Sequence, residues 1–136
     1  MVDGLFFFVL CDQGQDLGTF TTPLECGRMW RVKFDKEFIG RDALLKQRDE
    51  GVKKMYIQLL LNEHDPDMDY WSWGGEPIYR NGKFAGQTTT TTYGYTFKKQ
   101  VCVGFVENFD EDGNLQTVTN EFLLSGEFEV EIAGIR

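Results

Sequence analysis

The stretch Glu76-Pro77-Ile78-Tyr79-Arg80-Asn81-Gly82-Lys83-Phe84 carries the clearest fold signal in the sequence. Its Asn81-Gly82 pair supplies the two residues with positive φ that a type I′ two-residue turn requires. The residues on either side can pair across such a turn. The stretch therefore predicts an antiparallel hairpin in which residues 76–80 pair with residues 83–87.

Further strand signals lie on both sides of this hairpin. Alternating or continuous apolar residues predict strands at 30–34, 53–61, 101–106 and 127–132, and a run of five β-branched threonines predicts one at 88–92. In the last range three apolar residues alternate with three glutamates, as in a half-buried antiparallel strand. A turn at 110–113 precedes a short predicted strand at 115–118. Turns recur as closely as in a small barrel or sandwich, so the sequence predicts a mainly β fold.

One segment, residues 40–49, predicts a helix, because Ala43, Leu44 and Gln47 can share a face and Gly51 follows as a stop. Residues 62–75 are polar and then aromatic. They predict a long exposed loop that is anchored at its end.

Composition excludes several classes of function. The 136 residues fit one domain, and the net charge of −8 comes without a run of Lys or Arg that could bind nucleic acid or anionic lipid. The longest apolar run, residues 5–10, is far shorter than the roughly 20 residues that span a bilayer. Three widely spaced cysteines indicate a reducing compartment rather than a disulfide scaffold or a zinc site.

No complete catalytic or metal-binding set is present in the sequence. His64 is the only histidine and is expected to be solvated in a loop. Asp65, Asp67 and Asp69 resemble alternating calcium ligands, but Pro66 interrupts them and the loop glycine and distal glutamate of the calcium motif are missing. Cys26 and Cys102 are expected to be structural, and no glycine-rich phosphate loop precedes a helix.

The best candidate for a functional surface is an aromatic cluster. Trp and Tyr dominate interface anchors because they combine large contact area with a polar group. An alternative stays open, in which half of these rings fill one end of the barrel. The candidate interaction surface consists of Trp71, Trp73, Tyr93 and Tyr95.

An ordered set of motifs resembles the C-terminal domain of the aminomethyltransferase (glycine-cleavage T-protein) superfamily. The set comprises residues 21–27 (Thr-Thr-Pro-Leu-Glu-Cys-Gly), 38–44 (Phe-Ile-Gly-Arg-Asp-Ala-Leu), 75–79 (Gly-Glu-Pro-Ile-Tyr) and 103–106 (Val-Gly-Phe-Val). The resemblance implies a small antiparallel β-barrel with one short helix over residues 15–136. Residues 1–14 do not match the family, and we expect the barrel to be truncated at both ends.

Within the superfamily, residues 24–27, 40–47 and 74–82 most resemble the regulatory-subunit family of mitochondrial pyruvate dehydrogenase phosphatase. That resemblance implies a non-catalytic C-terminal module in the mitochondrial matrix. Its partner would be the phosphatase catalytic subunit, and it would modulate dephosphorylation of the pyruvate dehydrogenase complex. The alternative is an accessory domain that closes the folate site of a flavoenzyme similar to sarcosine or dimethylglycine dehydrogenase.

The resemblance also bears on cofactors and partners. Superfamily relatives hold tetrahydrofolate between an amino-terminal domain and this barrel, while their catalytic aspartate and FAD site lie upstream. We therefore expect no catalytic residue and no cofactor in this chain. Thr88-Thr89-Thr90 replaces the family's Thr-Ser-Gly or Thr-Ser-Ser, which makes folate contact doubtful there. A missing final strand would leave residues 127–132 as an unpaired edge, so we expect self-association through that edge.

Overall fold

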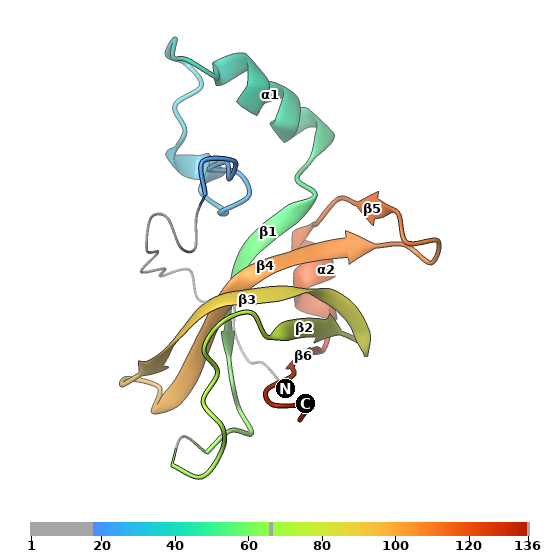
Figure 1. Ribbon diagram of the computed structural model, residues 1–136. Coiled ribbons are helices and arrows are strands. Elements are labelled where there is room, and N and C mark those ends of the chain that lie inside the picture. The colour runs from blue at the N-terminus through green and yellow to red at the C-terminus, as the bar shows by residue number, and fades with distance from the viewer. Residues whose placement is uncertain (1–17, 66, 136) are drawn as a thin grey trace.

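The computed structural model describes residues 18–65 and 67–135, and within them one antiparallel sheet of six strands forms the centre of the molecule (Figure 1). The strand order is β1-β4-β3-β2-β6, and β5 pairs with β4. The strands are β1 (Lys54–Leu60), β2 (Pro77–Arg80), β3 (Lys83–Gly94), β4 (Lys99–Phe109), β5 (Leu115–Gln116) and β6 (Phe128–Val130). The segment 1–14, with its apolar run at 5–10, lies outside the described residues.

The hairpin between β2 and β3 is confirmed. Asn81 and Gly82 have φ values of 50° and 75°, which is the pair of positive angles that a type I′ turn needs. Arg80 pairs with Lys83 and Tyr79 with Phe84, and a bulge between Ile78 and Tyr79 shifts the register further along. Local turn chemistry alone was therefore enough to fix this pairing.

The other strand predictions hold with one exception. Residues 53–61, 88–92, 101–106, 115–118 and 127–132 all contribute to strands of the sheet. Residues 30–34, in contrast, do not form the predicted strand, because Met29–Arg31 is a 3₁₀ helix. The N–H groups of Cys26, Gly27, Arg28 and Arg31 bond to carbonyls three to five residues back, so the chain coils here instead of extending.

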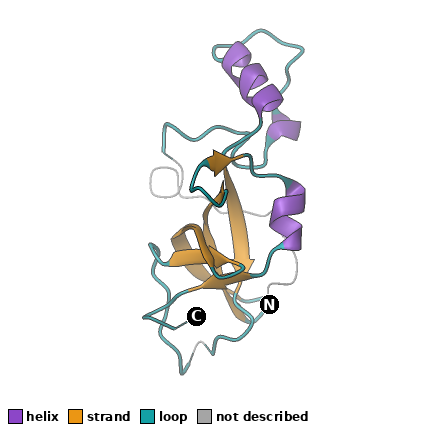
Figure 2. Cartoon of the chain, turned by 90° about the vertical axis from the view of Figure 1, so that its right-hand side faces the viewer, coloured by secondary structure: helices purple, strands orange, loops and turns teal. Residues whose placement is uncertain are grey.

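In the part of the chain that the structure describes, two α-helices flank the sheet. The predicted helix is present as α1 (Arg41–Glu50), followed by Gly51 with φ 81°. The second, α2 (Asn120–Ser125), was not predicted, and it begins at Thr119, whose hydroxyl accepts a hydrogen bond from the Phe122 N–H. Figures 1 and 2 show α1 at one end of the sheet and α2 along its side.

The hydrophobic core lies between the sheet and α2. It draws residues from β1, β2, β4, α2 and β6, and Met55 of β1 and Leu61, just after β1, pack against it. Its most deeply buried members come from β1, β2 and β4. The buried cluster is Ile57, Leu59, Ile78, Cys102, Val106, Val118, Leu123, Phe128 and Val130.

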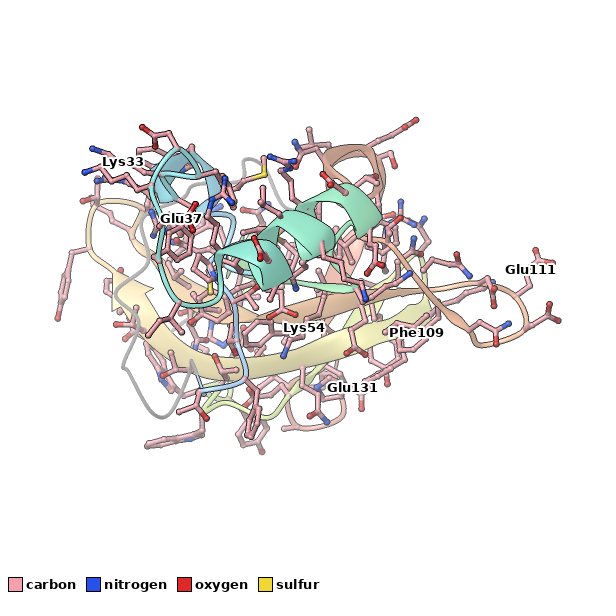
Figure 3. All side chains as sticks on the ribbon, turned by 90° about the horizontal axis from the view of Figure 1, so that it is seen from above. Lys33, Glu37, Lys54, Phe109, Glu111 and Glu131 are labelled. Carbon is pink, nitrogen blue, oxygen red and sulfur yellow. The ribbon has the colours of Figure 1, made fainter. Side chains whose placement is uncertain are left out.

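The part of the chain before β1 contacts the sheet through a backbone hydrogen bond, in which the Glu25 carbonyl accepts from the Tyr56 N–H at 2.7 Å. Within that part, the Thr22 hydroxyl donates to the Gln47 side-chain oxygen of α1, also at 2.7 Å. Lys33 and Glu37 lie at the outer end of this part (Figure 3). None of the helices formed by residues 18–65 and 67–135 is long and apolar enough to cross a membrane.

Candidate interaction surface

The loop between β1 and β2 is anchored by one buried residue, Ser72. Its carbonyl oxygen accepts hydrogen bonds from the Thr91 hydroxyl and, at 3.2 Å, from the Gln100 side-chain amide. Both Ser72 and Gln100 are fully buried. Since a buried carbonyl without a partner is costly, these bonds hold residue 72 in place against β3 and β4.

Glu76 makes a second anchor a few residues later. Its carboxylate accepts hydrogen bonds from the N–H groups of Trp73 (2.7 Å) and Gly74 (2.9 Å) and from the Thr88 hydroxyl (2.5 Å). Desolvation acts to raise the pKa of Glu76, but the bonds from Thr88 and from Trp73 outweigh it and hold the pKa below its ordinary value. The ionised carboxylate therefore locks the turn that carries Trp73.

Gly74 explains how closely this turn approaches β3. Its φ is 107°, and a Cβ atom at this position would lie 2.3 Å from the Thr89 carbonyl oxygen. A side chain fits neither the backbone angle nor the space. The loop thus packs backbone against backbone on the threonine-rich part of β3.

These anchors place the four predicted aromatic residues at one end of the sheet. The ring centroids of Trp71 and Tyr93 are 6.5 Å apart, and those of Tyr93 and Tyr95 are 5.1 Å apart in an edge-to-face arrangement. Trp71 and Tyr93 are half-buried, whereas Trp73 and Tyr95 are 83% and 85% exposed. Tyr93 therefore joins Trp71 and Tyr95 in one row of rings, and Trp73 and Tyr95 project into solvent.

His64 extends this aromatic row. Its ring lies edge-on to Trp71 with the centroids 6.5 Å apart, and its Nε2 lies 2.9 Å from the Tyr70 carbonyl oxygen. A carbonyl can only accept, so Nε2 carries the proton in this contact. The geometry supports a packing role for His64 and gives no catalytic pairing.

The aspartates near His64 form turns. The Asp69 carboxylate accepts from the Asp65 N–H at 2.7 Å, and the Asp65 carboxylate accepts from the Asp67 N–H at 3.0 Å. Asp110 behaves similarly: hydrogen bonding, first from the Asn114 N–H, lowers its pKa. Within 18–65 and 67–135 no group of three His, Cys, Asp or Glu residues is placed to hold a metal ion.

Cys102 is a buried thiol of the core, as the sequence predicted. Burial raises the pKa of Cys102 to about 12, with a weaker opposing effect from the Ser72 hydroxyl. A thiol with so high a pKa is almost entirely protonated at neutral pH and is a poor nucleophile. Its role is therefore packing.

The threonine-rich part of β3 does not fit a folate ligand. The hydroxyls of Thr88, Thr89 and Thr91 donate within the chain to Glu76, the Val103 carbonyl and the Ser72 carbonyl. Residues 72–76 also cover this part of the strand, as the approach of Gly74 to Thr89 shows. All three of these hydroxyl protons are therefore used in hydrogen bonds within the chain.

Sequence reasoning missed the residues that build the surface, namely Ser72, Glu76 and Gln100. Two features of the sequence pointed to Ser72 and Gln100. Side chains alternate in direction along an extended chain, so Ser72, between Trp71 and Trp73, is expected on the side opposite both rings. Gln100 is a polar residue at the start of an apolar strand, which is the usual mark of a buried hydrogen bond.

The fold and site together define a small antiparallel barrel-type domain with an anchored aromatic loop. Residues 54–136 match the glycine cleavage T-protein C-terminal barrel domain, and the chain belongs to this family. The family assignment and the fold class predicted from the sequence are thereby confirmed.

Three relatives illustrate the range of the family. The chain is 56% identical over 126 residues to the mitochondrial pyruvate dehydrogenase phosphatase regulatory subunit of Mus musculus, covering 90% of this chain and 14% of that protein. It is 33% identical over 121 residues to an aminomethyltransferase of Pseudothermotoga lettingae (89% and 29%). It is 32% identical over 122 residues to the mitochondrial sarcosine dehydrogenase of Mus musculus (88% and 12%). The chain thus spans less than a third of each of these proteins.

Proposed function

We propose that this chain acts as a non-catalytic interaction module of the pyruvate dehydrogenase phosphatase regulatory-subunit type. The observation that carries the proposal is the 56% identity over 90% of the chain to the mouse regulatory subunit. Identity to the aminomethyltransferase and to sarcosine dehydrogenase is much lower, at 33% and 32%. This difference favours regulation over a role in an oxidising enzyme.

The partner in this proposal is the phosphatase catalytic subunit, which would bind the surface formed by Trp71, Trp73, Tyr93 and Tyr95. Trp73 and Tyr95 are exposed, and Trp73 lies on a turn fixed by Glu76. Because the backbone that carries Trp73 is already ordered, binding costs less backbone entropy than it would on a mobile loop, which improves affinity. Binding there would modulate dephosphorylation of the pyruvate dehydrogenase complex.

The proposed location is the mitochondrial matrix. The names of the mouse regulatory subunit and of sarcosine dehydrogenase both describe mitochondrial proteins. Cys102 is a buried thiol in the core, which fits a reducing compartment.

The alternative, a domain that closes a folate site, receives less support. The hydroxyls of Thr88, Thr89 and Thr91 are occupied by contacts within the chain. A folate-closing domain would need polar groups that face the ligand.

A phosphatase assay tests the proposal. The catalytic subunit would be incubated with phosphorylated pyruvate dehydrogenase complex and increasing amounts of this chain. We expect a saturable change in the rate of phosphate release. A rate that stays constant at all concentrations, together with no binding of the catalytic subunit to the immobilised chain, would overturn the proposal.

A further inference from the structure

The aromatic surface formed by Trp71, Trp73, Tyr93 and Tyr95 lies beside an acidic loop. Residues 62–79 contain no Lys or Arg. The His64 ring contacts the Trp71 ring, with the centroids 6.5 Å apart, so this loop adjoins the row of rings. Rings and negative charges therefore lie next to each other. The exposed carboxylates of the loop belong to Glu63, Asp65, Asp67 and Asp69.

These carboxylates retain the capacity to bind a partner. Asp65 and Asp69 each accept one backbone N–H of the loop, at 3.0 and 2.7 Å, which fixes their positions. The two oxygens of a carboxylate offer about four lone-pair sites, so most of these sites stay available. In the described part of the chain, no ion pair neutralises Asp65, Asp67 or Asp69. The loop thus presents ordered negative charge to solvent.

Other rings of this chain carry a cation of the chain itself. The Arg31 guanidinium lies 4.1 Å from the centroid of the Trp30 ring, and three further Arg or Lys side chains lie 4.1–5.4 Å from phenylalanine rings. Within residues 18–65 and 67–135, no such cation lies over a ring of the aromatic surface. Since the faces of Trp and Tyr attract cations, the exposed rings of Trp73 and Tyr95 are available to a cation from a partner.

Charge determines which class of partner fits. Lys98 in the turn after Tyr95, and Lys99, which donates to the Asn62 side chain at 2.7 Å, offset the four carboxylates only in part. A second copy of this chain docked through the same surface would place carboxylates opposite carboxylates, which is unfavourable. A basic segment of a different protein is the complementary partner.

Arginine fits this surface better than lysine does. Its planar guanidinium stacks on aromatic rings, forms paired hydrogen bonds with a carboxylate and is more weakly hydrated than an ammonium group. The contacts within the chain follow the same preference, because three of the four cations over rings of the described residues are arginines.

We propose that the aromatic surface binds an arginine-containing segment of its partner. The guanidinium groups of that segment stack on Trp73 and Tyr95 and pair with the carboxylates of residues 63–69. The identity of the partner rests on the proposed function, whereas the chemistry of the segment follows from the surface itself.

Fluorescence anisotropy with a labelled peptide of alternating arginine and serine tests the proposal on the intact chain. A peptide of alternating lysine and serine has the same charge and is the control. We expect the arginine peptide to bind about fivefold more tightly, because guanidinium groups stack on rings and pair with carboxylates where ammonium groups do not. Equal binding of the two peptides, or binding of neither, would overturn the proposal.

Variants of two exposed tryptophans locate the site. Trp73→Ala should weaken binding of the arginine peptide by about tenfold, because it removes an exposed ring on which a guanidinium stacks. Trp30→Ala is the matched control, since that ring already carries Arg31, and it should leave the affinity unchanged. Wild-type affinity for both variants, or equal losses from both, would contradict the proposal.

Charge reversal at Asp67 tests the carboxylates. The Asp67 N–H donates to the Asp65 carboxylate at 3.0 Å, and the Asp112 N–H donates to the Asp110 carboxylate at 3.1 Å in the turn that follows β4. These two exposed aspartates thus occupy similar turns, and Asp112 is the control. Asp67→Lys should weaken binding of the arginine peptide by about three- to fivefold, and Asp112→Lys should change it little. The same loss from both would show attraction by net charge alone and would refute the proposal.

Binding of the phosphatase catalytic subunit separates this site from the proposed function. If the subunit binds through arginines, Trp73→Ala and Asp67→Lys should both weaken its affinity. A loss with Trp73→Ala alone would retain the proposed function and overturn the arginine site. Affinity that neither variant changes, while the arginine peptide responds to both as expected, would overturn the proposed partner and support the arginine site.

Discussion

Substitutions at Gly74 and Gly75 distinguish two ways in which a side chain would destabilise the anchored loop, namely backbone strain and steric overlap. Both have positive φ, at 107° and 90°, but only Gly74 lies against backbone atoms, and the position of a Cβ at Gly75 is open. Gly75→Ala should lower the free energy of unfolding by about 1–3 kcal/mol through backbone strain alone. Gly74→Ala should lower the free energy of unfolding by about 1–3 kcal/mol more, because its Cβ would also overlap the Thr89 backbone. Chemical denaturation measures both, and equal losses would mean that the loop does not pack on Thr89.

Glu76 should make stability depend on pH. Its folded pKa lies below the ordinary value of 4.5, so its contribution is present above about pH 4.5 and is lost as pH falls through the folded pKa. Glu76→Gln should therefore reduce stability at neutral pH and flatten its decline in acid. Thr88→Val should flatten the acid decline in stability only in part, because it removes one of the hydrogen bonds that lower the pKa of Glu76. Unfolding curves from pH 7 to pH 3 test this, and parallel curves for wild type and Glu76→Gln would refute it.

At the scale of elements, Arg80 connects β2 to α2. Its guanidinium donates to the Phe122 carbonyl at 2.9 Å and to the Ser125 hydroxyl at 3.1 Å, and it lies 4.1 Å from the centroid of the Phe122 ring. Lysine keeps the charge but cannot reproduce this planar set of contacts.

Arg80→Lys should therefore lower the free energy of unfolding by about 1–2 kcal/mol. Lys83→Arg, at the exposed position paired with Arg80 across the hairpin, should be neutral. Denaturation of the two variants is the measurement. Arg80→Lys with wild-type stability would show that α2 docks without these contacts.

The elements also show what the sequence could and could not predict. The hairpin at Asn81-Gly82 was predictable because its chemistry is local. The predicted strand at 30–34 was wrong because its alternation does not mark a buried face: Trp30 is 68% exposed and Arg31 stacks on it at 4.1 Å. Helix α2 has six residues, too few for a periodic signal, although Thr119 as a cap and Gly126 as a stop bracket it.

The aromatic surface was only partly predictable for a similar reason. The residue types identified the four rings, but their exposure depends on contacts between distant parts of the chain. Gln100 and Thr91 hold Ser72 across separations of 28 and 19 residues. No local pattern encodes such contacts, so the sequence could not separate the exposed Trp73 from the half-buried Trp71.

For the molecule as a whole, the proposed function includes the absence of catalysis. The purified chain, supplied with tetrahydrofolate and with sarcosine or dimethylglycine, should form no product. The physical reason is that the buried Cys102 thiol is protonated and His64 contacts the Tyr70 carbonyl and the Trp71 ring. Mass spectrometry of the reaction mixture is the measurement. Product that appears with the native chain and disappears after heat denaturation would contradict the proposal.

Binding of the phosphatase catalytic subunit to three forms of this chain tests the central claim most directly. Trp73→Ala removes a ring that is 83% exposed on the anchored loop, and Trp30→Ala removes one that is 68% exposed in the 3₁₀ helix Met29–Arg31, outside the aromatic surface. If the aromatic surface binds the partner, Trp73→Ala should weaken affinity by tenfold or more, as an anchor worth about 2 kcal/mol does, and Trp30→Ala should match wild type. Equal affinities for all three forms, or a loss confined to Trp30→Ala, would contradict the account.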